Sequence, residues 1–174
     1  MFDTDNPPKS YEKFKKQVLR GIEDADLEGE ENFPAALFLV NRKNEAKIIY
    51  VDALIEEIEE DPEEFLEAFE LSEEEVEDFE ISLQFIVNGV LPNRIKSFGS
   101  KYFCMVFGAI KTTQDEEAEK IVVALMGWLN ETEVFFANVF KENGQLQTSM
   151  WKEDNVYDYE ELAMNFRRAI TYQG

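Results

Sequence analysis

The run Ile121–Met126 (IVVALM) is apolar at every position, and this restricts what the chain can fold into. Successive side chains of a β-strand point to opposite faces of the sheet, so this run would place apolar groups on both faces. Phe135 and Phe136, in the next predicted strand, would likewise point to opposite faces of the sheet. An antiparallel sheet with one face in water would alternate apolar and polar residues instead. We therefore expect both faces to be covered, by helices of the same chain or, as the alternative, by a second copy in a homodimer.

The C-terminal half predicts a β-meander over residues 101–152. Its strand-like segments are rich in Val, Ile, Phe, Tyr and Met, and they are Lys101–Thr112, Lys120–Leu129, Glu133–Lys141 and Gln145–Trp151. Asn130-Glu131 and Asn143-Gly144 mark tight turns between them, and Asn-Gly is a strong signal for a two-residue hairpin. Nearer the N-terminus, Ala35–Val40 and Ala46–Val51 flank a polar turn and predict a separate hairpin.

Helical periodicity appears before and after these strands. Apolar residues at spacings of three and four follow the candidate N-cap Ser10, and they are Tyr11, Phe14, Val18 and Ile22. The exposed side of this helix carries the chain's one basic cluster, Lys13, Lys15, Lys16 and Arg20. A final helix bears Leu162, Phe166 and Ile170, with Asp158 and Glu161 as its capping residues.

These elements predict one α+β domain over residues 1–174, in which an antiparallel sheet is packed with about four helices. Residues 23–34 are interpreted as an acidic linker. Residues 53–91 are interpreted as two or three short acidic helices, with a restart at Asp61-Pro62 and an end near Asn88-Gly89 and Pro92. The order of elements is similar to that of PAS, GAF and roadblock domains, a likeness of element order alone.

The charge of the chain is concentrated in its second segment. Residues 23–90 contain three basic and twenty-three acidic residues, a net charge of −20 out of −21 for the whole chain. From Ala53 to Glu80 there are fifteen acidic residues and no Lys or Arg. If fully helical, this block would extend about 42 Å. Solvated helices gain stability from Lys placed among Glu at i,i+4, so a uniformly negative block indicates a role other than stability.

We interpret the acidic block as a docking surface for a basic partner protein, with simple solvation of helix faces as the alternative. The residues expected to make the contact are Glu56, Glu57, Glu59, Glu60, Asp61, Glu63, Glu64, Glu67, Glu73, Glu74, Glu77 and Asp78. Carboxylates standing where phosphates would lie could inhibit a nucleic-acid-binding protein, the physics used by phage anti-defence proteins and other DNA mimics. The negative charge predicts no direct binding of nucleic acid or of anionic lipid.

Two other functions remain open at the level of sequence. A small acidic α+β protein could be an immunity protein or a secretion chaperone that binds its partner through aromatic anchors, with acid only steering association. It could instead sense a small ligand, as PAS and GAF domains do, in a pocket between the acidic helices and the Phe-rich sheet.

Composition argues against an enzyme. There is no His and only one Cys, which excludes Ser-His and Cys-His nucleophilic systems and thiolate or imidazole zinc sites. No Gly-rich phosphate loop or EF-hand spacing is present, and Cys104 lies between apolar neighbours that favour burial. We expect no cofactor, no metal and no membrane association. A lone Cys and an acidic N-terminus without a signal peptide predict a cytoplasmic protein.

Overall fold

The computed structural model describes residues 5, 7–24, 35–60, 89–112, 118–129, 131–154 and 159–171. Its helices are α1 (Tyr11–Glu23), α2 (Val51–Glu60), α6 (Leu91–Ser97) and α7 (Glu160–Thr171). Its strands are β1 (Ala36–Asn41), β2 (Ala46–Tyr50), β3 (Ser100–Thr112), β4 (Ala118–Trp128), β5 (Glu131–Glu142), β6 (Gln145–Thr148) and β7 (Lys152–Asp154).

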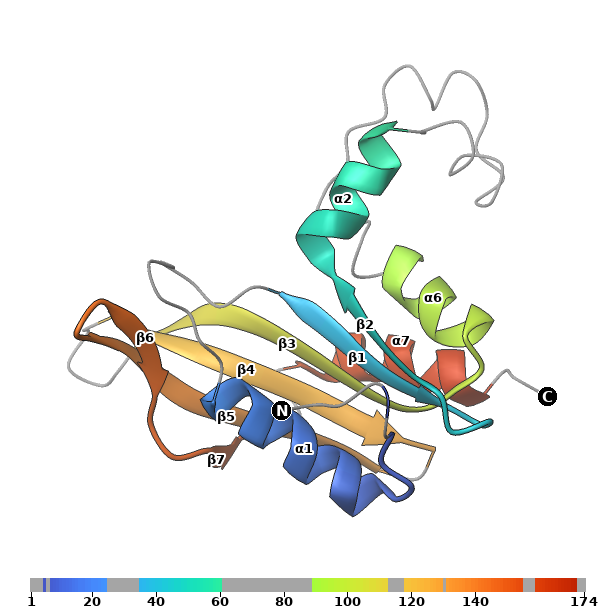
Figure 1. Cartoon of the computed structure of the whole chain (residues 1–174), viewed down its shortest axis with the longest axis horizontal. Helices are drawn as coiled ribbons and strands as arrows, with labels where there is room; N and C mark the ends of the chain where they lie inside the picture. Colours follow the sequence, from blue (N-terminus) through green and yellow to red (C-terminus); the bar gives the residue numbers. More distant parts are fainter. Residues whose placement is uncertain are drawn as a thin grey trace.

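The strands form one curled antiparallel sheet in the order β2-β1-β3-β4-β5-β6, with β7 also paired to β5 (Figure 1). The hairpin β1-β2 joins the meander because β1 pairs with β3 through Ala36↔Val106 to Val40↔Tyr102. The predicted α+β class, an antiparallel sheet built from an N-terminal hairpin and a C-terminal meander, is confirmed.

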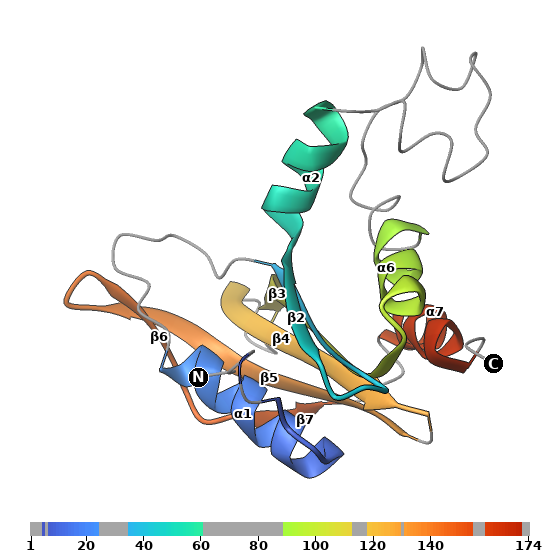
Figure 2. The same ribbon diagram turned by 45° about the vertical axis from the view of Figure 1, so that its right-hand side comes forward.

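Helices of the same chain cover both faces of this sheet (Figures 1 and 2). Helix α1 lies on one face, where its apolar stripe meets alternate residues of β3 and β4 such as Cys104 and Val122. Helices α6 and α7 lie on the other face, against Phe103 and Leu125. Every residue of the run Ile121–Met126 is at most 4% exposed. The apolar run is therefore explained without a second copy of the chain.

Local chemistry defines several element ends as predicted. The Ser10 Oγ accepts a hydrogen bond from the Lys13 backbone N–H at 3.3 Å and caps α1. Asn143 and Gly144 have φ values of 54° and 79°, as a two-residue type I′ hairpin between β5 and β6 requires.

Three predicted boundaries were wrong. Pro92 does not end a helix: it occupies the first turn of α6, where a missing N–H costs no hydrogen bond. Val51 begins α2 instead of ending a strand. The predicted strand Gln145–Trp151 is shorter than expected: β6 ends at Thr148, and the chain pairs with β5 again only as β7, which begins at Lys152.

Parts of the predicted organisation fall on residues that the structure does not describe. In the acidic segment 53–91, most of α2 and the start of α6 are described, and residues 61–88 are not. In the acidic linker 23–34, the described residues are Glu23 and Asp24, at the end of α1. Asp158, the predicted cap of the last helix, also lies outside the described residues, as does Asn130. Glu131, expected in the same turn as Asn130, instead begins β5 and pairs with Trp128.

Candidate functional site

Helix α2 carries the described part of the predicted acidic surface. Val51, Leu54 and Ile58 lie three and four positions apart and are at most 3% exposed, so one side of the helix faces the core. Its exposed carboxylates are those of Asp52, Glu56, Glu57 and Glu60. Figures 1 and 2 show α2 extending away from the sheet, so these groups stand at one end of the molecule.

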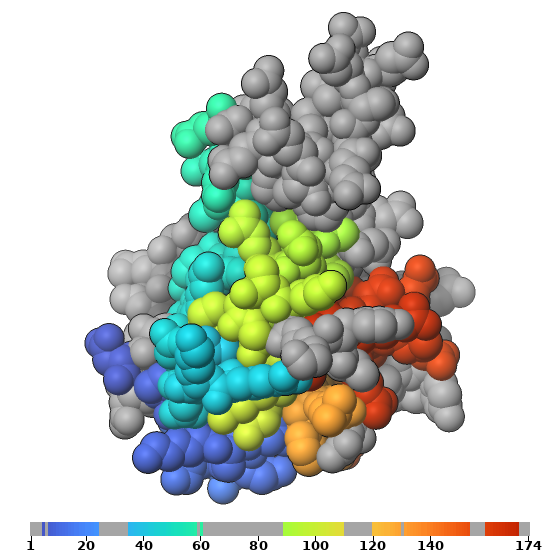
Figure 3. All heavy atoms as spheres, turned by 90° about the vertical axis from the view of Figure 1, so that its right-hand side faces the viewer, coloured from blue at the N-terminus to red at the C-terminus, as the bar shows by residue number. Residues whose placement is uncertain are grey.

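A neighbouring helix neutralises one of these carboxylates. The Arg94 Nη2 on α6 lies 3.5 Å from the Glu57 Oε1, and the two side chains are 30% and 64% exposed. Figure 3 shows α6 on this face of the molecule between α2 and α7. Within the described part of the chain, no ion pair involves Asp52, Glu56 or Glu60. The acidic side of α2 therefore retains most of its charge.

The structure places only some of the predicted contact residues. Glu56, Glu57 and Glu60 lie together on α2, and Glu59 belongs to the same helix, although its side chain is not described. The remaining eight lie outside the described residues: Asp61, Glu63, Glu64, Glu67, Glu73, Glu74, Glu77 and Asp78.

The basic cluster of α1 lies on the opposite face of the sheet from α2 (Figure 2). The basic cluster therefore does not dock against α2. The Lys15 Nζ instead lies 3.1 Å from the Glu133 Oε1 on β5 and 4.9 Å from the centre of the Phe135 ring. Lys13, Lys16 and Arg20 are exposed. The molecule thus presents a basic helix on one side and an acidic helix on the other.

Glu133 also ties α1 to the sheet through a second residue. The Tyr11 Oη donates a hydrogen bond of 2.8 Å to the Glu133 Oε2, while Lys15 holds the other carboxylate oxygen. Burial, together with the hydrogen bond and negative charge of Glu133, raises the pKa of Tyr11. The phenol therefore stays protonated at neutral pH, and this cluster of Tyr11, Lys15 and Glu133 anchors α1.

Cys104 and the described carboxylates are the side chains to consider for nucleophilic or metal chemistry. Cys104 is 0% exposed, and burial raises the pKa of its thiol, so the thiolate needed for nucleophilic attack is disfavoured. Among the described residues, no group of three or more Cys, Asp or Glu side chains is arranged to hold a metal ion.

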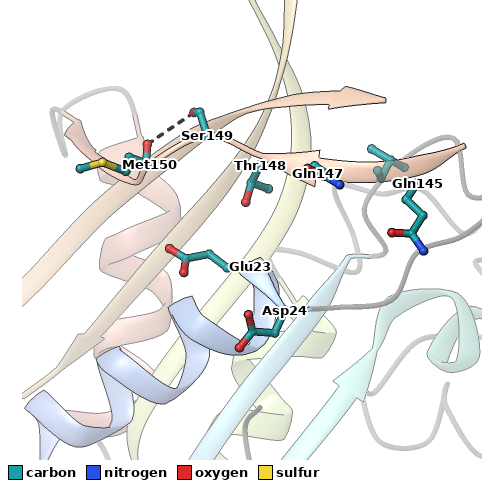
Figure 4. Close-up of a pocket in the computed structure, with 8 residues that line it drawn as sticks. Glu23, Asp24, Gln145, Gln147, Thr148, Ser149 and Met150 are labelled. Carbon is teal, nitrogen blue, oxygen red and sulfur yellow. Dashed lines mark hydrogen bonds between the residues drawn. The ribbon is translucent and has the colours of Figure 1, made fainter. Parts of the chain in front are cut away.

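A pocket of about 580 Å³ lies between the end of α1 and strand β6 (Figure 4). Its lining residues are Glu23, Asp24, Gln145, Leu146, Gln147, Thr148, Ser149 and Met150. This is not the pocket of the ligand-sensing alternative, which would lie between the acidic helices and the Phe-rich sheet. The two adjacent carboxylates at the end of α1 and the Asn-Gly hairpin were visible in the sequence. Their proximity was not, since more than 100 residues separate them.

Comparison with known proteins does not assign the chain to a family. No described helix is long and apolar enough to cross a membrane. Comparisons with protein-family models, with curated proteins and with solved structures found no match, so the likeness of element order to PAS, GAF and roadblock domains gains no support from them. The function must therefore be argued from the surface itself.

Proposed function

We propose that the protein is a non-enzymatic binding protein whose acidic helices engage a basic surface on a partner protein. The observation that carries this proposal is the separation of charge on the molecule. The exposed carboxylates Glu56 and Glu60 lie on a helix that extends from the body, and the basic helix α1 lies on the opposite face of the sheet. The acid is therefore available to another molecule.

A basic nucleic-acid-binding surface is the partner class that this arrangement suits best. Such a surface is shaped and charged to meet phosphates, and a row of carboxylates would be attracted to it and would occlude it. The protein would then act as an inhibitor in the manner of a nucleic-acid mimic. The remaining acidic residues of the block 53–80 would extend the contact beyond α2.

The experiment is capture of partners at low salt by the wild-type protein and by two charge-reversal variants. In one variant Glu56 and Glu60 on α2 become Lys, and in the matched control Glu131 and Glu153, exposed on β5 and β7, become Lys. Each pair raises the formal net charge from −21 to −17. We expect the α2 variant to lose at least about tenfold in affinity for the captured partner while the control binds almost as wild type.

Salt provides an independent check on the same complex. Affinity should fall steadily as salt rises from about 50 mM to about 200 mM, because the contact is electrostatic and exposed. Equal losses in both variants would indicate a general effect of net charge and would contradict a role for α2. Binding that tightens with salt would contradict the proposal as well.

A second candidate is binding through aromatic anchors, as an immunity protein or a secretion chaperone would do. It is favoured by Tyr50, which is 50% exposed at the end of β2 and directly precedes α2. Alanine at Tyr50 would then weaken the complex more than the reversal of Glu56 and Glu60 does. Large aromatic side chains dominate contacts of that kind, and charges at their rim change mainly the association rate.

A further inference from the structure

The pairing of β6 with β5 determines which of its backbone N–H and C=O groups point away from β5. The type I′ turn closes on the pair Glu142↔Gln145, which exchanges backbone hydrogen bonds in a two-residue hairpin. Hydrogen-bonded pairs alternate along an antiparallel ladder, so Gln147 also faces β5 with its N–H and C=O. The Ser149 N–H continues this alternation with a bond of 2.9 Å to the Asn138 carbonyl. The main-chain groups of Leu146 and Thr148 therefore point away from β5.

No described strand pairs with this outward side of β6, which ends the strand order of the sheet. The whole segment Gln145–Met150 lines the pocket of about 580 Å³. Unpaired N–H and C=O groups at a strand edge are a template for another extended chain. The length of β6, four residues, sets the length of chain that could pair with it.

The far side of this pocket is formed by Glu23 and Asp24, the last residue and the C-cap of α1. Figure 4 shows Thr148 and Glu23 pointing into the same space between β6 and α1. Negative charge at the C-terminus of a helix is unfavourable because the helix dipole is negative there. Helix stability therefore does not explain this pair of carboxylates. Their effect is to make the space beside the strand edge attractive to cations.

The two faces of β6 differ in chemistry. Leu146 and Thr148 lie on the face that α1 covers, where Leu146 is 5% exposed. Gln147 lies on the other face, beside its cross-strand neighbour Phe140, whose side chain is 44% exposed. A strand added at this edge would continue both faces, since side chains alternate along it. Every second side chain would approach Glu23 and Asp24, and the others would lie on the Gln147 and Phe140 side.

We propose that β6 binds an extended peptide segment of a partner protein by strand addition, and that the segment alternates basic and apolar residues. The basic side chains pair with Glu23 and Asp24, the apolar ones extend the surface of Phe140, and the backbone bonds to Leu146 and Thr148. This site lies at the end of α1 and not on α2, so it is independent of the function proposed above.

The test uses a peptide of alternating Val and Lys, six residues long, with fluorescein on its N-terminus and an amidated C-terminus. Binding to the whole protein is followed by fluorescence anisotropy, and a peptide with three Val followed by three Lys serves as the control of equal composition. We expect the alternating peptide to bind at least about tenfold more tightly, which corresponds to about 1.4 kcal/mol. Methylation of its backbone amides should abolish binding, because methylated amides cannot donate to the strand edge.

Variants of the protein locate the site. Thr148→Pro removes an N–H that points away from β5, and proline is tolerated at such an edge position. It should weaken binding of the alternating peptide about tenfold. Thr148→Val, which keeps the N–H, should bind as wild type. Glu23→Gln combined with Asp24→Asn should also weaken binding, with a melting temperature equal to or above that of the wild type.

Several results would overturn the inference. These are no binding by the wild-type protein, equal binding of the two peptides, or full binding of the backbone-methylated peptide. The last outcome remains decisive if Thr148→Pro fails to fold. Loss of peptide binding on reversal of Glu56 and Glu60, with Glu23 and Asp24 intact, would assign the peptide to α2 instead. Self-association of the wild type that Thr148→Pro removes would show that a second copy occupies the edge.

Discussion

Helices α1 and α2 have the same pattern of apolar residues at spacings of three and four, yet they are attached to the sheet in different ways. Helix α1 lies along the sheet, where Tyr11 and Lys15 bond to Glu133 and the Trp151 Nε1 donates to the Leu19 carbonyl at 3.3 Å. Helix α2 extends away from the sheet, and its described polar tie is an exposed pair with Arg94.

The two helices differ in the side chains that surround their apolar stripes. Aromatic side chains and partly buried polar contacts hold α1 along the sheet, with the Phe14 ring centre 5.6 Å from that of Tyr102. The described stripe of α2 is aliphatic, and carboxylates occupy much of its remaining surface. An amphipathic pattern therefore predicts a buried side, while the orientation of the helix depends on the side chains around that side.

The largest expected effect is on the side of α1. Phe14→Ala should lower the free energy of unfolding by about 3–5 kcal/mol, since the ring is 0% exposed between aromatic neighbours. Leu54→Ala on α2 should cost less, toward the lower end of about 2–5 kcal/mol. Urea unfolding of both variants measures the difference. A greater loss at Leu54 would show that α2 is the better anchored helix.

The next effect concerns the ion pair that holds α1. Glu133→Gln should cost about 1–3 kcal/mol, because it removes the negative charge beside the partly buried Lys15. Lys15→Met, which removes the opposite charge and keeps the apolar stem, provides the complementary variant. If the double variant is no less stable than Glu133→Gln alone, the cost arises from the unpaired lysine. Strict additivity of the two single losses would contradict coupling between them.

The stability of α1 should also depend on alkaline pH. The raised pKa of Tyr11 means that the folded protein holds this proton more tightly than the unfolded chain does. The stabilisation is complete below the ordinary value of about 10 and is lost as pH rises above it, by up to about 1.4 kcal/mol per pH unit. Stability curves from pH 9 to about 11 should therefore fall less steeply for Tyr11→Phe than for the wild type.

The control for this measurement is Tyr50→Phe, at an exposed tyrosine beside α2. Its curve should follow that of the wild type. The buried Cys104, whose pKa is also raised, is present in all three proteins and contributes equally to their slopes. An unchanged slope in Tyr11→Phe would indicate that another group causes the alkaline loss.

The smallest effect is expected at the exposed pair of α2. Glu57→Gln removes its contact with Arg94, which lies at 3.5 Å with both side chains in partial contact with water. Exposed pairs of this kind contribute at most about 1 kcal/mol, so the change in thermal stability should be small and should vanish at high salt. A loss equal to that of Glu133→Gln would remove the contrast between the two helices.

Much of the fold followed from local chemistry. The helix at Tyr11–Glu23 was predictable because its cap and its apolar spacing agree, and the β5-β6 hairpin was predictable because Asn-Gly favours positive φ at both turn positions. Pro92 was misread because a proline is compatible both with the end of one helix and with the first turn of the next. The break after Thr148 was missed because it rests on a side chain: the Ser149 Oγ accepts the Asn138 N–H at 2.8 Å.

The two candidate sites, the acidic side of α2 and the pocket beside β6, also differ in whether the sequence could predict them. The acidic character of α2 was visible in the sequence, because a helix that buries Val51, Leu54 and Ile58 must expose the glutamates between them. The pocket beside β6 was not visible, since it joins Glu23 to Gln147 across most of the chain. Its strand edge exists because β6 is the last strand in the order of the sheet.

Residue type and short-range spacing were enough to predict a sheet with two apolar faces, an amphipathic basic helix and a uniformly negative block. Long-range contacts were needed to place the basic helix and α2 on opposite faces of the sheet, and to bring the end of α1 to β6. Those contacts join residues distant in the chain, and they follow from the order in which the strands pair.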